Sequence, residues 1–95
     1  MSNEQKTVLI ADDEPANREV LREQLEAYVQ GNYEIREAEN GNEAITSLRE
    51  SPVDLAILDM NMPGMSGEKV VRQLKTEGYT SALCIYTASG KNFRE

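Results

Sequence analysis

Short apolar runs alternate with longer amphipathic segments along almost the whole chain, and this alternation limits the folds that the sequence can adopt. The short runs span residues 7–11, 33–38, 53–58 and 82–86. Their length predicts strands, and the continuously apolar first run is typical of a strand that is buried on both faces. Residues 33–38 begin by alternating apolar and charged side chains, which predicts an edge strand.

The segments between these runs predict three helices, because their apolar residues recur at helical spacing. These residues are Ala16, Val20, Leu21, Leu25, Tyr28 and Val29 in the first helix, Ala44, Ile45 and Leu48 in the second, and Val70, Val71 and Leu74 in the third. Arg18 falls on the polar side of the first helix. Pro15 suits a first helical turn, and the turn at residues 40–42 and Ser66 can cap the other two helices. A further helix is expected to begin at residues 91–95. Strands that alternate with helices predict a parallel sheet with helices on both faces.

The size and charge of the chain exclude several classes of protein. A length of 95 residues gives room for one small domain. The net charge of −7 argues against a nucleic-acid-binding surface, because phosphate contacts need clustered Lys and Arg. The sequence contains no histidine, which excludes the usual hydrolase triads, histidine-rich zinc sites and a phosphohistidine role. No apolar run approaches the roughly 20 residues of a membrane span, and we expect no signal peptide.

Cys84 lies within an apolar run, so we expect it to be a small buried hydrophobic residue. It is the only cysteine, and one cysteine cannot form an internal disulfide. This usage is compatible with a cytoplasmic protein.

Polar residues follow three of the predicted strands at the point where each strand ends. Asp12 and Asp13 follow the first strand, Asp59 follows the third, and Thr87 follows the fourth. Taken singly, the first two are ordinary helix-capping residues and Asp59 is an ordinary turn residue. In an open parallel sheet, however, ligands bind outside the carboxyl ends of the strands. Neighbouring carboxylates repel by about 4 kcal/mol at an effective dielectric near 20. Their joint placement therefore predicts a hard divalent cation such as Mg²⁺.

These residues, in this order, resemble the receiver domain of bacterial two-component response regulators. The resemblance rests on Asp12-Asp13 after the first strand, on residues 59–67 (DMNMPGMSG) after the third, and on Thr87-Ala88 after the fourth. It implies a three-layer, doubly wound α/β fold of flavodoxin-like type with strand order 2-1-3-4-5. The chain stops before the fifth strand and fifth helix of that fold. We therefore expect residues 1–95 to form a single receiver domain that is incomplete at its C-terminal end.

The resemblance also implies a role for each matching residue. Asp59 is the expected phosphoacceptor, which takes a phosphoryl group from a histidine of a sensor histidine kinase or a histidine phosphotransfer protein. Thr87 is the expected switch hydroxyl, and the small Ala88 leaves room for the phosphoryl group. The expected ligands of Mg²⁺ are Asp12, Asp13, Asp59 and the main-chain carbonyl of Asn61. The protein is then a switch that phosphorylates and dephosphorylates itself, and it is not an enzyme with a separate substrate.

The sequence departs from the family pattern at two places. Ser66 stands where the family usually has aspartate, and serine caps a helix equally well. The family's lysine lies at the end of a fifth strand, and Lys91 does not match that position. We expect the 95 residues by themselves to be phosphorylated slowly, because this lysine helps to neutralise the phosphoryl oxygens.

Two other functions are compatible with the same residues. One is an interaction module that binds a kinase or another partner without phosphorylation. The other is a Mg²⁺-dependent phosphatase with an aspartate nucleophile, which would need a carboxylate two residues after the nucleophile, where this chain has Asn61. The fourth predicted strand, residues 82–86, has no charge and no proline, so its edge could pair with another copy of the chain. We therefore predict that two copies associate as a homodimer through that edge or through the sheet face that a fifth helix would cover, and we expect no contact with nucleic acid or membrane.

Overall fold

A computed structural model describes residues 5–87 of the chain. Its elements in chain order are β1 (Lys6–Ala11), α1 (Pro15–Tyr28), β2 (Tyr33–Ala38), α2 (Gly41–Glu50), β3 (Leu55–Asp59), α3 (Gly67–Thr76) and β4 (Ala82–Tyr86). The predicted alternation of strands and helices is confirmed. Ala88 and the helix expected from Lys91 lie outside the described residues. Among the helices in the described part, none is long and apolar enough to cross a membrane.

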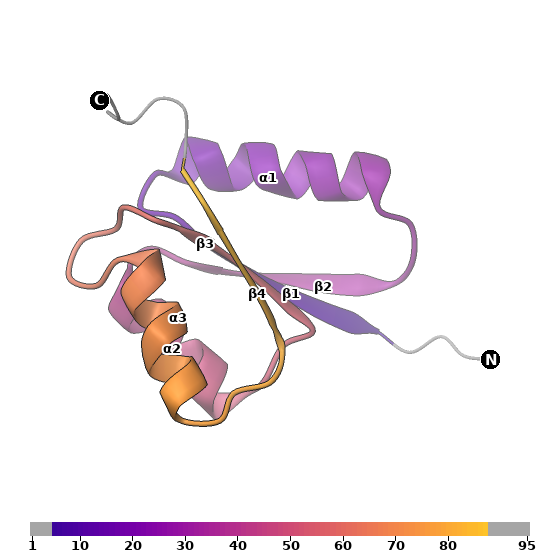
Figure 1. The fold of residues 1–95 in the computed structure, drawn as a ribbon. Coiled ribbons are helices and arrows are strands. Elements are labelled where there is room, and N and C mark those ends of the chain that lie inside the picture. Colours follow the sequence, from indigo (N-terminus) through magenta and orange to yellow (C-terminus); the bar gives the residue numbers. More distant parts are fainter. Residues whose placement is uncertain (1–4, 88–95) are drawn as a thin grey trace.

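The four strands form one parallel sheet in the order β2-β1-β3-β4. This order confirms the one that the resemblance implied for these strands. Figure 1 shows α1 on one side of the sheet and α2 with α3 on the other, so the molecule has three layers. The central β1 pairs with β2 on one side and with β3 on the other, and Val8 to Ala11 are buried, as expected for a strand covered on both faces.

The main core lies between the sheet and the pair formed by α2 and α3. Its buried members are Leu9, Ala11, Ala38, Ala44, Ile45, Leu48, Val53, Ala56, Leu58, Met62, Val70 and Leu74. The apolar positions predicted for these two helices are therefore confirmed, with Val71 only partly buried against this core. The side chain of Asn40 accepts a hydrogen bond from the Glu43 amide, and that of Ser66 accepts one from the Lys69 amide. Both predicted helix caps are confirmed.

The layer formed by α1 differs from the prediction. Val20 is 50% exposed and Tyr28 is 82% exposed, whereas the buried residue of α1 is Arg18. The partly buried stripe of α1 runs from Arg18 through Leu21 to Leu25, and Val20 lies on the far side of the helix from Arg18. The apolar spacing predicted correctly where α1 lies in the sequence, but it predicted wrongly that Val20 and Tyr28 face the core.

Two further differences arise at the sheet. We predicted a strand over residues 53–58, but β3 runs from Leu55 to Asp59, and the Asp54 side chain and amide bond Thr7 of β1 before the strand begins. Cys84 is exposed, and the prediction that it is buried was wrong. It pairs with Ile57 on the α1 side of the sheet, on an outer strand. Ile57 is itself only partly buried, so this side is covered less completely than the other.

We predict that the two helical layers differ in their sensitivity to truncation. Leu48→Ala removes a fully buried side chain of α2 and should lower the free energy of unfolding by about 2–5 kcal/mol. Val20→Ala, at a half-exposed position of α1, should change it by less than about 0.5 kcal/mol. Urea unfolding followed by circular dichroism measures both changes, and equal losses would contradict this account of the core.

Candidate functional site: an acidic cluster at the strand ends

The sheet register brings three aspartates together. Ala11 of β1 pairs with Leu58 of β3, so Asp12 and Asp59 follow at the same edge of two neighbouring strands. One carboxylate oxygen from each of Asp12, Asp13 and Asp59 lies within 4.8 Å of the others. Asp12 and Asp59 are completely buried and Asp13 is exposed. The predicted gathering of these carboxylates, which we call the acidic cluster, is confirmed.

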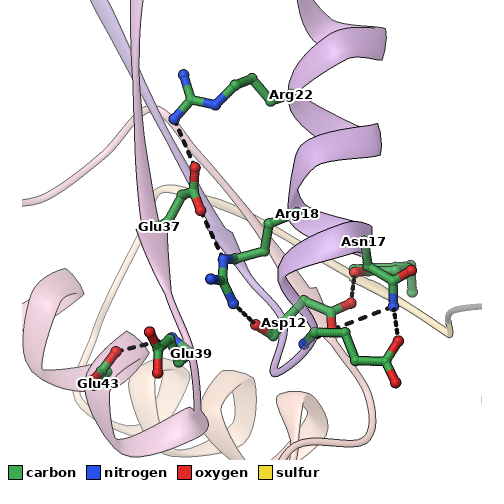
Figure 2. Close-up of polar contacts among 9 residues, drawn as sticks. Asp12, Asn17, Arg18, Arg22, Glu37, Glu39 and Glu43 are labelled. Atoms are coloured by element: carbon green, nitrogen blue, oxygen red, sulfur yellow. Dashed lines mark hydrogen bonds and ion pairs between the residues drawn. The ribbon is translucent and has the colours of Figure 1, made fainter.

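The Asp12 carboxylate is oriented by several hydrogen bonds. Its Oδ1 accepts from the Glu14 amide at 2.8 Å and from Asn17 Nδ2 at 3.5 Å, while its Oδ2 accepts from the Tyr86 hydroxyl. Figure 2 shows Asn17 turned toward Asp12 from the first turn of α1. The N-cap position of α1 is Glu14, which makes no side-chain cap bond. Asp12 therefore holds the turn before α1 and is not itself the cap residue.

The Asp59 carboxylate is held by the loop that follows it. The Asn61 amide donates to Asp59 Oδ1 at 3.1 Å. The loop then returns to the end of β3, where the Gly67 amide donates to the Met60 carbonyl at 3.2 Å. A Cβ atom at Gly67 would lie 2.4 Å from the Asp59 carbonyl oxygen, so this position requires glycine. The glycine that ends the 59–67 signature is thus explained by close backbone approach.

Thr87 lies one residue beyond the end of β4 and is exposed. Its hydroxyl donates to the Met60 sulfur across 3.8 Å. The Met60 amide in turn donates to the Tyr86 carbonyl at 2.7 Å. Thr87 therefore follows β4, the strand next to β3, and lies beside Met60, the residue after Asp59. The sequence predicted this position at the end of the fourth strand.

Tyr86 belongs to the site although the sequence analysis did not select it. Its hydroxyl bonds Asp12, two strands away in the sheet. Burial, followed by the hydrogen bond to Asp12 and the charges of the three aspartates, raises the pKa of the Tyr86 phenol. The phenol therefore stays a protonated donor near neutral pH. A hydroxyl at the end of an apolar run, immediately before Thr87, was the available signal.

Arg18 also belongs to the surroundings of the site, although the sequence placed it on the polar side of the first helix. Its Nη1 donates to the Asp12 carbonyl at 2.7 Å and its Nε donates to Glu37 at 2.7 Å. Arg22 donates to the other Glu37 oxygen at 2.7 Å (Figure 2). Hydrogen bonds from Arg22 and then Arg18 lower the pKa of Glu37. This network ties α1 and β2 to the main chain at Asp12.

The acidic cluster has the chemistry of a site for a hard cation. Like charges at this separation repel strongly, and neutral donors such as the Tyr86 hydroxyl and the Asn61 amide offset only part of the repulsion. Mg²⁺ prefers oxygen ligands and keeps several waters or phosphate oxygens when it binds to one or two carboxylates. The three aspartates supply carboxylate oxygens at one edge of the sheet, so they fit such an ion.

The fold and the acidic cluster together define a doubly wound α/β domain with a candidate divalent-cation site at the carboxyl edge of its sheet. The model of the response regulator receiver domain family matches residues 8–94. The chain therefore belongs to the response regulator receiver domain family.

Individual relatives agree with this assignment. The chain is 43% identical over 90 residues to the transcriptional regulatory protein ResD of Bacillus subtilis, covering 95% of this chain and 35% of ResD. It is 40% identical over 87 residues to the response regulator GtcR of Aneurinibacillus migulanus, covering 92% of this chain and 34% of GtcR. It spans about a third of the length of each of these relatives.

A solved structure shows the same fold. The response regulator protein TrrA from Thermotoga maritima, in complex with Mg(2+)-BeF, superposes with a TM-score of 0.77 and is 38% identical. The match covers 90% of this chain and 72% of the TrrA chain. The family of the chain and its fold are thus established by independent comparisons.

Proposed function

We propose that the chain is a signalling switch in which Asp59 accepts a phosphoryl group from a histidine of a sensor histidine kinase or a histidine phosphotransfer protein. The observation that carries the proposal is the buried Asp59, whose carboxylate lies beside those of Asp12 and Asp13 at the end of β3. Membership of the receiver family supports it. We place the reaction in the cytoplasm, in keeping with the single cysteine of the chain.

The transfer is a nucleophilic substitution at phosphorus. A carboxylate oxygen of Asp59 forms a bond to phosphorus as the bond between phosphorus and the donor imidazole nitrogen breaks. The electron pair of that bond returns to the imidazole, and Asp59 becomes an acyl phosphate. The Asn61 amide, which donates to Asp59 Oδ1, orients the nucleophile for this step.

The residues that would hold Mg²⁺ are Asp12, Asp13, Asp59 and the main-chain carbonyl of Asn61. The cation, when bound, would neutralise charge on the transferred phosphoryl oxygens. The buried aspartates fit this task because they lie at the strand ends with their oxygens already close together. The Mg(2+)-BeF complex of the related TrrA supports the same choice of metal.

Thr87 would report the phosphorylation to the rest of the molecule. A phosphoryl group adds about −1.5 to −2 charges at neutral pH and brings three acceptor oxygens. The Thr87 hydroxyl now contacts the sulfur of Met60, which is a weak acceptor. A phosphoryl oxygen on Asp59 is a much stronger acceptor, so the hydroxyl would leave the sulfur and draw the end of β4 toward Asp59.

We predict that Mg²⁺ binds the acidic cluster and shifts the amide signals of Asp12, Asp13, Asp59 and Asn61 in a titration followed by nuclear magnetic resonance. Asp13→Ala should remove the response, because it deletes one of the clustered oxygens. Glu19→Ala is the matched control, because it removes the same charge from an exposed position of α1 outside the cluster. An unchanged titration in Asp13→Ala would show that the ligand assignment is wrong.

We predict that Asp59 is the residue that forms the acyl phosphate when a complete receiver domain containing this chain meets a small phosphodonor or its kinase in the presence of Mg²⁺. Asp59→Asn should abolish the added phosphoryl mass without unfolding the chain, because the two side chains have nearly the same shape. Asp54→Asn, at the opposite end of β3, should keep the label. Acid-stable label on serine or threonine in Asp59→Asn would contradict the proposal, and absence of label in the complete domain with Asp59 intact would favour an interaction module.

We also propose that two copies of the chain associate through the edge of β4. In the sheet formed by residues 5–87, β4 is an outer strand, and it carries neither charge nor proline. Sedimentation equilibrium at micromolar concentrations should therefore show a concentration-dependent dimer. Cys84→Lys, which puts a charge on this exposed strand, should favour the monomer, whereas Val20→Lys on α1 should not. A monomer at all concentrations would rule out this association.

A further inference from the structure

Tyr86 of β4 bonds a member of the acidic cluster through its side chain. It is the last residue of the strand and pairs with Asp59 in the sheet register. Its hydroxyl donates to Asp12 Oδ2, and its carbonyl accepts the Met60 amide at 2.7 Å. A single residue therefore bonds both strand ends that carry the buried aspartates.

The hydroxyl is one of the hydrogen-bond donors that fix Asp12. Oδ1 of this carboxylate is directed by the Glu14 amide, which belongs to the turn before α1. Oδ2 is directed by Tyr86 from the other side of the acidic cluster. Because Asp12 is completely buried, rotation of its carboxylate would break these bonds without replacement by bulk water. The two oxygens are thus held in one orientation before any cation arrives.

We propose that Tyr86 is a positioning residue of the cation site: its hydroxyl holds the Asp12 carboxylate in the orientation that accepts Mg²⁺ and connects that carboxylate to the strand end that carries Thr87. This proposal rests on the proposed function, because it assumes that the acidic cluster binds Mg²⁺. Outer hydrogen bonds that orient metal ligands are a general means by which proteins set metal affinity.

The connection to Thr87 follows from the chain itself. Thr87 is the next residue after Tyr86, and its hydroxyl contacts Met60, whose amide bonds the Tyr86 carbonyl. A cation bound by Asp12 would therefore change the hydrogen bond between Asp12 and the Tyr86 hydroxyl. Tyr86 would pass this change to Met60 and Thr87, which lie beside Asp59. Tyr86 would let the cation site and the switch hydroxyl influence each other even before phosphorylation.

The test compares two variants that each remove one phenolic oxygen from the full chain. Tyr86→Phe removes the bond to Asp12, whereas Tyr79→Phe removes a hydroxyl that meets the Val53 amide at 3.4 Å, away from the acidic cluster. The dissociation constant for Mg²⁺ is measured by titration of the amide signals of Asp13 and Asn61. We expect it to rise by about tenfold or more in Tyr86→Phe, in line with the typical cost of about 10–100-fold for losing such a bond. It should stay within about twofold in Tyr79→Phe.

A second readout does not depend on the affinity. In the absence of Mg²⁺, the Glu14 amide signal should shift in Tyr86→Phe and stay in place in Tyr79→Phe, because that amide donates to Asp12. In the unaltered chain, the ring signals of Tyr86 should shift during the Mg²⁺ titration with the same midpoint as Asp13. A Tyr86→Phe chain that binds Mg²⁺ as tightly as the unaltered chain would overturn this inference alone. Failure of the unaltered chain to bind Mg²⁺ would overturn both this inference and the cation site of the proposed function.

Discussion

Ala11 pairs with Leu58 in the two central strands, so the chain leaves the sheet at Asp12 and at Asp59 side by side. This parallel register places two buried carboxylates at one edge of the sheet, where they repel each other. The surrounding hydrogen-bond donors offset part of that repulsion. The Glu14 amide and the Tyr86 hydroxyl bond one carboxylate, and the Asn61 amide bonds the other. Hydrogen bonds from neutral donors of this kind stabilise the negative charges of both carboxylates.

The loop between Asp59 and α3 keeps the backbone close to the end of β3. The loop turns back so that Gly67 lies against the carbonyl of Asp59, where no side chain fits. Ser66, one residue earlier, caps α3 and fixes where the helix begins. The phosphoacceptor candidate is therefore held between a paired strand and a helix that is itself anchored in the main core through Val70 and Leu74.

Much of this arrangement could be predicted from the sequence because the signals are local. Runs of apolar residues define the strands, and a parallel sheet brings their carboxyl ends to one edge, which was enough to gather Asp12, Asp13 and Asp59. Arg18 and Tyr86 could not be placed in this way. A charged residue on a helix is usually solvated. Arg18 can be buried because Glu37 of β2 and the Asp12 carbonyl, which follows β1, accept its hydrogen bonds.

The exposure of Cys84 could not be predicted for a related reason. An apolar run shows that a strand exists, but it does not show how completely each face of that strand is covered. Cys84 lies on the α1 side of the outer strand, beyond the residues that α1 buries. Coverage of this kind depends on the spatial arrangement of helices and is not encoded in the spacing of any one segment.

The network of Arg18, Glu37 and Arg22 gives the two helical layers different kinds of attachment. The layer of α2 and α3 is held by an apolar core, whereas α1 depends in addition on a glutamate whose pKa is lowered by its arginine partners. The stability that this lowered pKa provides is present above the pKa of an unfolded glutamate and is lost as the pH falls through the folded value. Mild acid therefore weakens this part of the attachment of α1. We therefore expect amide hydrogens of α1 to exchange with solvent by partial opening more readily than those of α2 and α3.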